Sequence, residues 1–149
     1  MIAKLLTILL LSNLLFAGIN STVKIDYNAL DKISTNNIVR IIGNKMAKSM
    51  PFQLDYLTKV TRVFTYKNTI TTYKEIDTRH IDFKRIWSLS KINTINAMFK
   101  QDSQVVCYNK ITNYMIVKRN IILKYNYLDK NNRPLFEYTV EKEDCLKIK

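Results

Sequence analysis

Two thiols, Cys107 and Cys145, are the residues whose chemistry depends most on where this chain resides. In an oxidising compartment such thiols pair as a disulfide, whereas in the cytosol they stay reduced. The alternative to a disulfide is a pair of buried free thiols, because the sequence holds no Cys/His cluster with the spacing of a zinc site. The prediction for the two thiols therefore depends on whether the chain is exported.

The first eighteen residues predict export. A single positive charge, Lys4, precedes an apolar run over residues 5–16, and two small residues follow at positions 17–18. This order is typical of a secretory signal peptide, and the run is shorter than the ~20 apolar residues that cross a bilayer. We assign residues 1–18 to a signal peptide, with an uncleaved N-terminal anchor as the alternative.

Export favours the disulfide over free thiols. We expect a periplasmic or secreted protein of a Gram-negative bacterium in which Cys107 and Cys145 are bridged. A bridge across a loop of this length stabilises a fold by roughly 2 to 4 kcal/mol. No later stretch of the sequence approaches the length of a bilayer span, so we expect no transmembrane segment in the mature chain.

The only histidine, His80, lies in the segment DTRHID between Asp77 and Asp82. A His/Asp pair can act as a general acid and base, so this segment is the one candidate catalytic site. The alternative is a surface or helix-capping histidine, which we favour because no serine or cysteine nucleophile lies in a recognisable motif. The sequence also lacks a phosphate-binding glycine loop and the spacing of an EF-hand. We therefore expect a protein that is not an enzyme and that needs no cofactor or metal.

The charge of the chain points to an anionic partner. Its 149 residues carry 24 Lys and Arg against 12 Asp and Glu, a formal net charge of +12. The basic residues are scattered, and no RNA-binding aromatic signature or helix-turn-helix pattern is present, which disfavours nucleic acid. The nine tyrosines either lie on half-buried sheet faces or line a groove for a peptide, and the sequence does not choose between the two. A protein partner is the expectation that remains.

The length of the chain favours a single domain over residues 19–149. In its first half, the pattern predicts a helix that Ser34 caps and that ends before Pro51. Alternating residues over 56–66 and 69–76 then predict two strands of a hairpin around the turn at 67–68.

The second half predicts two helices and a second hairpin. A helix is expected over residues 82–100 with a break near Ser90, and Ser103 is expected to cap a further helix to about Val117. Strands are expected over residues 121–129 and from 135 to the final cysteine. This order predicts an α+β domain with an antiparallel sheet of four to five strands covered by helices and one disulfide. The bridge would tie the helix before the last hairpin to the end of the final strand.

These features together resemble the AspS-type pilotin family of type II secretion. The residues that carry the resemblance are an export signal, a Pro-led strand region MPFQLDYLTKVTRVFTYKNTITTYKEI, the motif C-x-N-x-x-T from Cys107, the strand and turn of IILKYNYLDKNNRPLFEYTV, and the closing Cys145. Apart from the export signal, these features span roughly residues 50–145. The resemblance implies a helix-covered antiparallel sheet with one disulfide in this position.

The same resemblance implies a function in binding. Pilotins of this kind bind a short C-terminal segment of the outer-membrane secretin, which folds as a helix in a groove, and escort it to the outer membrane. The sequence departs from the family at Ile19, which stands where the family has the lipid-bearing cysteine. The resemblance therefore implies a peptide-binding role without a lipid anchor at that position.

We thus expect an exported protein-binding module that resembles a secretin-escorting pilotin. The alternative, from another functional class, is a secreted inhibitor or immunity protein that blocks a partner enzyme. A small hydrolase centred on His80 ranks last. Beyond Cys107 and Cys145 as a disulfide, the sequence names no binding residues.

Overall fold

Five strands form one sheet in the order β1-β2-β3-β4-β5. The computed structural model describes residues 26–148, so the predicted signal peptide (1–18) and Ile19 lie outside the described residues. The strands are β1 (Phe52–Gln53), β2 (Thr58–Tyr66), β3 (Thr69–Ile76), β4 (Ile122–Asp129) and β5 (Pro134–Val140). The helices are α2 (Tyr27–Asp31), α3 (Thr35–Lys48), α4 (Ile81–Leu89), α5 (Lys91–Tyr108), α6 (Lys110–Arg119) and α7 (Lys142–Lys147).

The sheet is mostly antiparallel, which confirms the predicted α+β class with one disulfide. The pairing of β3 with β4 is parallel, with Ile70 opposite Leu123. The reason is the connection between them: the chain leaves β3 and returns through α4, α5 and α6, and a long helical crossover brings a strand back in the same direction. The two predicted hairpins, β2–β3 and β4–β5, are both present.

Helix α3 begins and ends where the sequence predicts. The Ser34 side chain accepts a hydrogen bond from Asn37 N at 3.4 Å, which caps the helix, and α3 stops at Lys48 before Pro51. Its buried residues are Ile38, Val39, Ile42, Gly43 and Met46. They form one apolar face, which packs on β2.

Ser90 separates α4 from α5, as predicted, and its side chain accepts a hydrogen bond from Asn93 N at 3.2 Å. The predicted cap at Ser103 is wrong. Ser103 lies inside α5, only 1% exposed, and the helix continues to Tyr108. Apolar residues on both sides of Ser103 pack in the core, and this packing outweighs the local preference of serine for a cap. The break falls instead at Asn109, whose Oδ1 accepts hydrogen bonds from the first backbone amides of α6.

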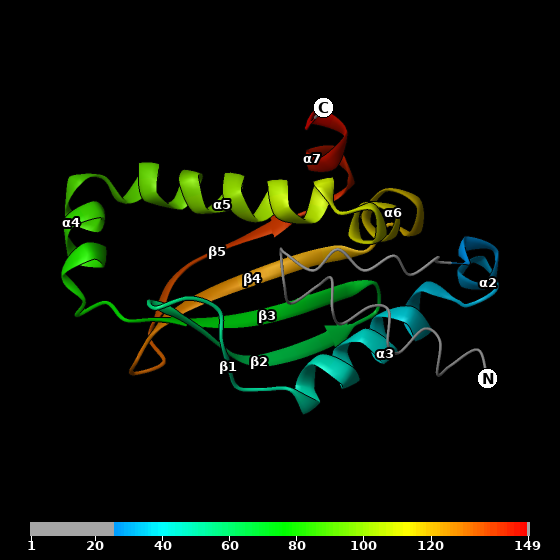
Figure 1. Cartoon of the computed structure of the whole chain (residues 1–149), viewed down its shortest axis with the longest axis horizontal. Coiled ribbons are helices and arrows are strands. Elements are labelled where there is room, and N and C mark those ends of the chain that lie inside the picture. The colour runs from blue at the N-terminus through cyan, green and yellow to red at the C-terminus, as the bar shows by residue number, and fades with distance from the viewer. Residues whose placement is uncertain (1–25, 149) are drawn as a thin grey trace.

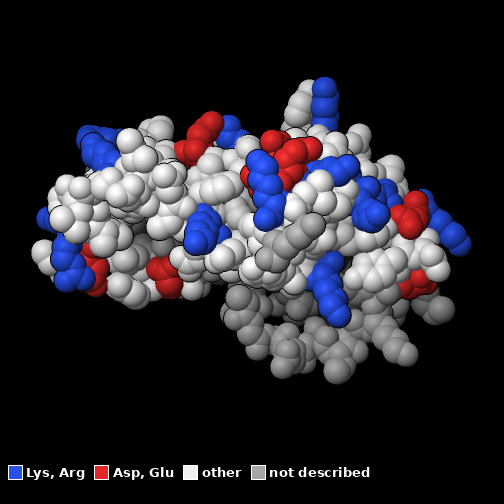
Figure 2. Space-filling view, turned by 90° about the horizontal axis from the view of Figure 1, so that it is seen from above, with Lys and Arg blue, Asp and Glu red and all other residues white. Residues whose placement is uncertain are grey.

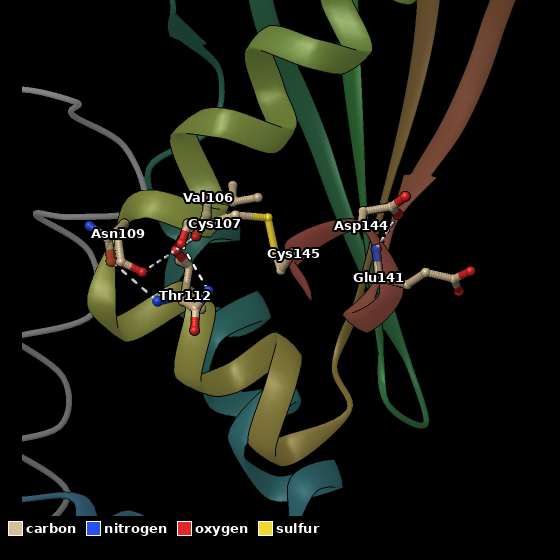
Figure 3. The surroundings of a disulfide bond; sticks show 8 residues. Val106, Cys107, Asn109, Thr112, Glu141, Asp144 and Cys145 are labelled. Atoms are coloured by element: carbon tan, nitrogen blue, oxygen red, sulfur yellow. Dashed lines mark hydrogen bonds between the residues drawn. A yellow bond between two sulfur atoms is a disulfide. The ribbon is translucent and has the colours of Figure 1, made fainter. Parts of the chain in front are cut away.

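The predicted final strand is too long. Strand β5 ends at Val140, and the chain then turns into α7, which contains Cys145. The helix starts there because Glu141 and Asp144 form a capping box, in which Glu141 N donates to Asp144 Oδ2 at 3.0 Å (Figure 3). The disulfide to Cys107 therefore joins α7 to α5, not the last strand to a helix as expected.

The main core lies between one face of the sheet and the helices α2, α3, α5, α6 and α7. The register places Thr65, Ile70, Leu123 and Val140 in one row across that face. In Figure 1, α3 runs below β2 and α5 above β5, while α4 stands at the end of the sheet opposite α6. None of the helices within residues 26–148 is both long enough and apolar enough to cross a membrane.

Candidate functional site

An open cleft of about 500 Å³ lies between α4 and the turn that joins β4 to β5. Ligand sites in proteins fall in the same range of size, about 300 to 1,000 Å³. Two segments far apart in the sequence, 78–91 and 129–135, meet to form it. Its lining residues are Thr78, Phe83, Lys84, Trp87, Ser88, Lys91, Asp129 and Leu135.

His80 helps to position the aromatic wall of the cleft because it starts α4. Its Nδ1 accepts a hydrogen bond from Asp82 N at 3.2 Å, so the imidazole caps the helix. One turn further, Phe83 and Trp87 share a face of α4, and their rings stack with centroids 5.2 Å apart. The indole of Trp87 also stacks on Phe136 of β5 at 5.7 Å. The wall is therefore held by both the helix and the sheet.

The predicted His/Asp pair has a structural role in the folded chain. His80 Nδ1 lies 3.6 Å from an oxygen of Asp82, but that carboxylate also accepts from Tyr56 OH at 3.2 Å and pairs with Arg85 at 3.3 Å. Asp77 does not face His80 in a pair but forms a hydrogen-bonded ion pair with Lys130 Nζ at 2.8 Å. This hydrogen bond lowers the pKa of the Asp77 carboxyl. His80 is therefore a helix cap, which is the alternative that the sequence analysis favoured.

Three stacked rings continue the wall into the sheet. Phe136 stacks on Tyr127 with centroids 4.5 Å apart, and Tyr127 is only 2% exposed. Tyr138 lies next to both rings on the same face. These two tyrosines thus lie on a covered sheet face behind the cleft, which is one of the two roles that the sequence left open.

A buried polar network fixes this aromatic cluster to α5. Lys74 Nζ of β3 lies 2.7 Å from Asp102 Oδ2 of α5, and it also donates to Tyr127 OH at 2.9 Å. The hydroxyls of Tyr127 and Tyr138 each donate to Asp102 Oδ2 at 2.8 Å. The ammonium group of Lys74 also lies over the ring of Tyr125, 4.3 Å from its centroid. One carboxylate therefore holds α5 to three strands.

Burial is the main cause of the pKa shifts in this network. It lowers the pKa of Lys74, and the Asp102 carboxylate opposes that shift. Burial, followed by the negative charge of Asp102, raises the pKa values of Tyr125, Tyr127 and Tyr138 well above the ordinary tyrosine range. The three hydroxyls therefore stay protonated in the folded chain and remain hydrogen-bond donors.

The charged rim of the cleft is basic. Lys84 and Lys91 line it from α4 and α5, both side chains are exposed, and Lys91 Nζ lies 5.8 Å from the centroid of Trp87. The one acidic lining residue, Asp129, uses its Oδ1 to accept hydrogen bonds from Asn131 N and Arg133 N within the turn. An aromatic wall beside two ammonium groups suits a segment that presents apolar side chains together with a carboxylate.

The disulfide lies at the other end of α5 from the cleft. Both cysteines are buried, with Cα atoms 5.1 Å apart. Next to it, Thr112 Oγ1 donates to the carbonyl oxygens of Val106 and Asn109 (Figure 3). Its place in the fold is therefore structural, and it takes no part in the cleft.

The residues of the cleft and the network have no joint signature in the sequence. Asp102 is 28 residues from Lys74 and 36 from Tyr138, so no spacing rule brings them together. Trp87 is the one signal that was available, because it is the only tryptophan of the chain and such side chains are enriched at binding sites. Within residues 26–148, no group of three or more His, Cys, Asp or Glu side chains is arranged to hold a metal ion.

The fold and the cleft define a small disulfide-bridged α+β domain with a basic, aromatic cleft at one end. No protein-family model and no curated protein sequence matches the chain. Solved structures do. A protein described as secreted, from Pseudomonas aeruginosa, is 14% identical with a TM-score of 0.60, and the match covers 74% of this chain and 92% of that one.

Two pilotins of type II secretion have the same fold. The match to EpsS from Vibrio vulnificus has 11% identity and a TM-score of 0.60, and it covers 74% of this chain and 91% of that one. The match to AspS from Vibrio cholerae has 11% identity and a TM-score of 0.57, covering 74% and 92%. At these identities the likeness is one of fold, and the chain has a pilotin-like fold.

Proposed function

We propose that this chain is an exported, pilotin-like protein-binding module that holds a short segment of an envelope partner in the cleft beside α4. The observation that carries the proposal is the cleft itself, in which Trp87 and Phe83 stand beside Lys84 and Lys91, in a fold shared with two secretion pilotins. The module works by binding and not by catalysis, since His80 is used as a helix cap.

The partner segment that fits best is an amphipathic helix with an acidic residue near its apolar stripe. Apolar anchors spaced along one helix face would contact Phe83, Trp87 and Leu135, and a carboxylate would reach the two lysines of the rim. The net charge of +12 accelerates encounter with such a partner. From the resemblance of the sequence to pilotins, we propose the C-terminal segment of a secretin as this partner.

The only tryptophan gives a direct test. The mature chain is titrated with a synthetic peptide of the secretin C-terminus encoded in the same genome, and Trp87 emission is followed. We expect a saturable change. Lys84→Glu with Lys91→Glu should weaken binding about tenfold or more at low salt, because each change turns an attraction into a repulsion. The matched control is Lys142→Glu with Lys147→Glu, two exposed lysines of α7 at the other end of the molecule.

Two outcomes contradict the proposal. If the peptide produces no saturable change, the secretin segment is not the partner. If both double variants lose affinity equally, net charge and not the cleft governs binding. The alternative function, an inhibitor or immunity protein, is tested by a pull-down from envelope extract followed by an activity assay. Capture and inhibition of an enzyme would support that alternative.

A further inference from the structure

Large apolar side chains gather at the end of the molecule that α4 forms. Ile81, Ile86, Leu89 and Ile92 are between 43% and 81% exposed, and together we call them the α4 tip. Tyr56, which is 71% exposed, lies beside the tip, because its hydroxyl donates to Asp82 Oδ2 at 3.2 Å. Exposed apolar side chains gathered at one end of a molecule indicate an interaction surface.

The tip is on the outer side of α4. Phe83 and Trp87 turn toward the sheet, and the helical repeat of 100° per residue places Ile81 and Leu89 on the opposite side. In Figure 1, α4 closes one end of the molecule, with no other element of residues 26–148 beyond it. The apolar surface is therefore convex, unlike the cleft on the other side of the same helix. A convex end suits a broad, deformable surface better than it suits a ligand helix, which needs a groove.

The charge around the tip is positive. Arg79 and Arg85 are exposed outside the cleft lining, and the helical repeat places Arg85 between Ile81 and Leu89 on the outer side of α4. Within the described part of the chain, Arg79 has no carboxylate at ion-pairing distance. Asp82 is already paired with Arg85 at 3.3 Å. Figure 2 shows Lys and Arg side chains around uncharged surface at this end of the molecule, with acidic side chains beside some of them.

We propose that the α4 tip docks on an anionic phospholipid surface. Leu89 and Ile92, 81% and 70% exposed, enter the boundary between headgroups and acyl chains, and Arg79 and Arg85 contact lipid phosphates. Because the tip and the cleft lie on opposite sides of α4, a bound peptide and a membrane can be held at the same time. The inference is independent of the partner assigned to the cleft.

Vesicle flotation of the mature chain tests the docking. One vesicle population is phosphatidylcholine with about one third phosphatidylglycerol, and the other is phosphatidylcholine alone. We expect binding to the anionic vesicles, weakened by salt, and little binding to the neutral ones. Leu89→Asp with Ile92→Asp should reduce partitioning about tenfold or more, because both side chains would carry charge into the interface.

The matched control changes two apolar residues of similar kind away from the tip. Val105→Asp with Leu146→Asp alters side chains that are 46% and 51% exposed, and it adds the same two negative charges. This variant should float like the unmodified chain apart from the effect of net charge, which is common to both double variants. Circular dichroism confirms that each variant is folded.

A second measurement reports insertion directly. In a Trp87→Phe background, Leu89→Trp places the only indole at the tip. Its emission should shift to shorter wavelength on anionic vesicles and should be quenched by brominated acyl chains. Absence of binding to anionic vesicles overturns the proposal, and so does equal loss in the tip and control variants. If the tip variant loses the secretin peptide and the vesicles bind neither chain, the tip is a protein contact and the membrane proposal fails.

Discussion

Lys74 of β3 and Asp102 of α5 form an ion pair of 2.7 Å behind the aromatic wall of the cleft, with Lys74 only 5% exposed. A buried ammonium group is tolerated only while its counter-charge and hydrogen bonds stay in place. The pair therefore links the position of α5 to the integrity of the surface that the cleft presents.

Asp102→Asn should destabilise the fold by about 3 to 5 kcal/mol, because it leaves Lys74 buried without a negative partner. Urea unfolding measures the loss. Glu137→Gln is the control: it breaks the pair with Lys124 at 2.8 Å, but the Glu137 side chain is 59% exposed, so we expect a change of about 1 kcal/mol or less. A loss that small for Asp102→Asn would contradict the account. Lys74→Met combined with Asp102→Leu should recover part of the stability, since neither charge is then buried, while the hydroxyls of Tyr127 and Tyr138 still lack the acceptor that Asp102 provides.

The tyrosines near Asp102 predict a loss of stability at alkaline pH. Their pKa values are raised in the folded state, so above the ordinary value of 10.0 the unfolded chain releases protons that the folded chain retains. The stabilisation is therefore complete below that pH and is lost above it, by up to about 1.4 kcal/mol per pH unit for each tyrosine. The lowered pKa of Lys74 acts in the opposite sense, since stability from that group rises as pH approaches 10.5.

Tyr138→Phe removes one of these titrations. The variant should lose some stability at neutral pH, through the hydrogen bond to Asp102, yet its slope above pH 10.0 should be shallower by about 1.4 kcal/mol per pH unit. Urea unfolding at a series of alkaline pH values gives the slope. Tyr66→Phe, at a side chain that is 73% exposed, serves as the control and should leave the slope unchanged. An unaltered slope in Tyr138→Phe would show that this hydroxyl does not contribute.

Removal of the disulfide should destabilise the chain by about 4 kcal/mol. The estimate follows from the 38 residues that separate Cys107 from Cys145, through the entropy of the closed loop in the unfolded state. Cys107→Ala with Cys145→Ala is compared with the unmodified chain by chemical denaturation, with and without reductant. Reductant should lower the stability of the unmodified chain and leave the variant unchanged. Two free thiols in the native protein would contradict the bridge.

Gly43→Ala should destabilise the chain although alanine is the better helix former. A Cβ at position 43 would lie 2.2 Å from Cγ2 of Thr65, so α3 and β2 would have to separate. Overpacking of this kind costs about 1 to 3 kcal/mol, more than the ~1 kcal/mol that alanine gains in helix propensity. Thr65→Ser removes the obstructing methyl, so Gly43→Ala should be tolerated better in that background. Equal losses in both backgrounds, measured by thermal unfolding, would contradict the steric cause.

Much of the secondary structure follows from signals within a few residues of each other. Ser34 caps α3 as expected, the helical segment breaks at Ser90 as expected, and the β2–β3 hairpin turns at 67–68, where Lys67 has a positive φ of 51°. Caps and turns depend on hydrogen bonds between near neighbours in the chain, so the residues that form them can be recognised from the sequence. The same applies to the alternating and helical apolar patterns, which determined the α+β class.

The remaining features were decided by packing between distant segments. Packing of Ser103 and of apolar residues before and after it in the core carries α5 through Ser103, and the crossover through α4–α6 makes β4 parallel to β3. The pairing of Lys74 with Asp102 and the cleft between 78–91 and 129–135 depend on contacts that no local spacing encodes. The sequence by itself determined the elements and the class of fold. Only the tertiary structure decided which charges are buried, which aromatic side chains form a wall and which apolar side chains face outward, because those depend on the free energy of the whole assembled core.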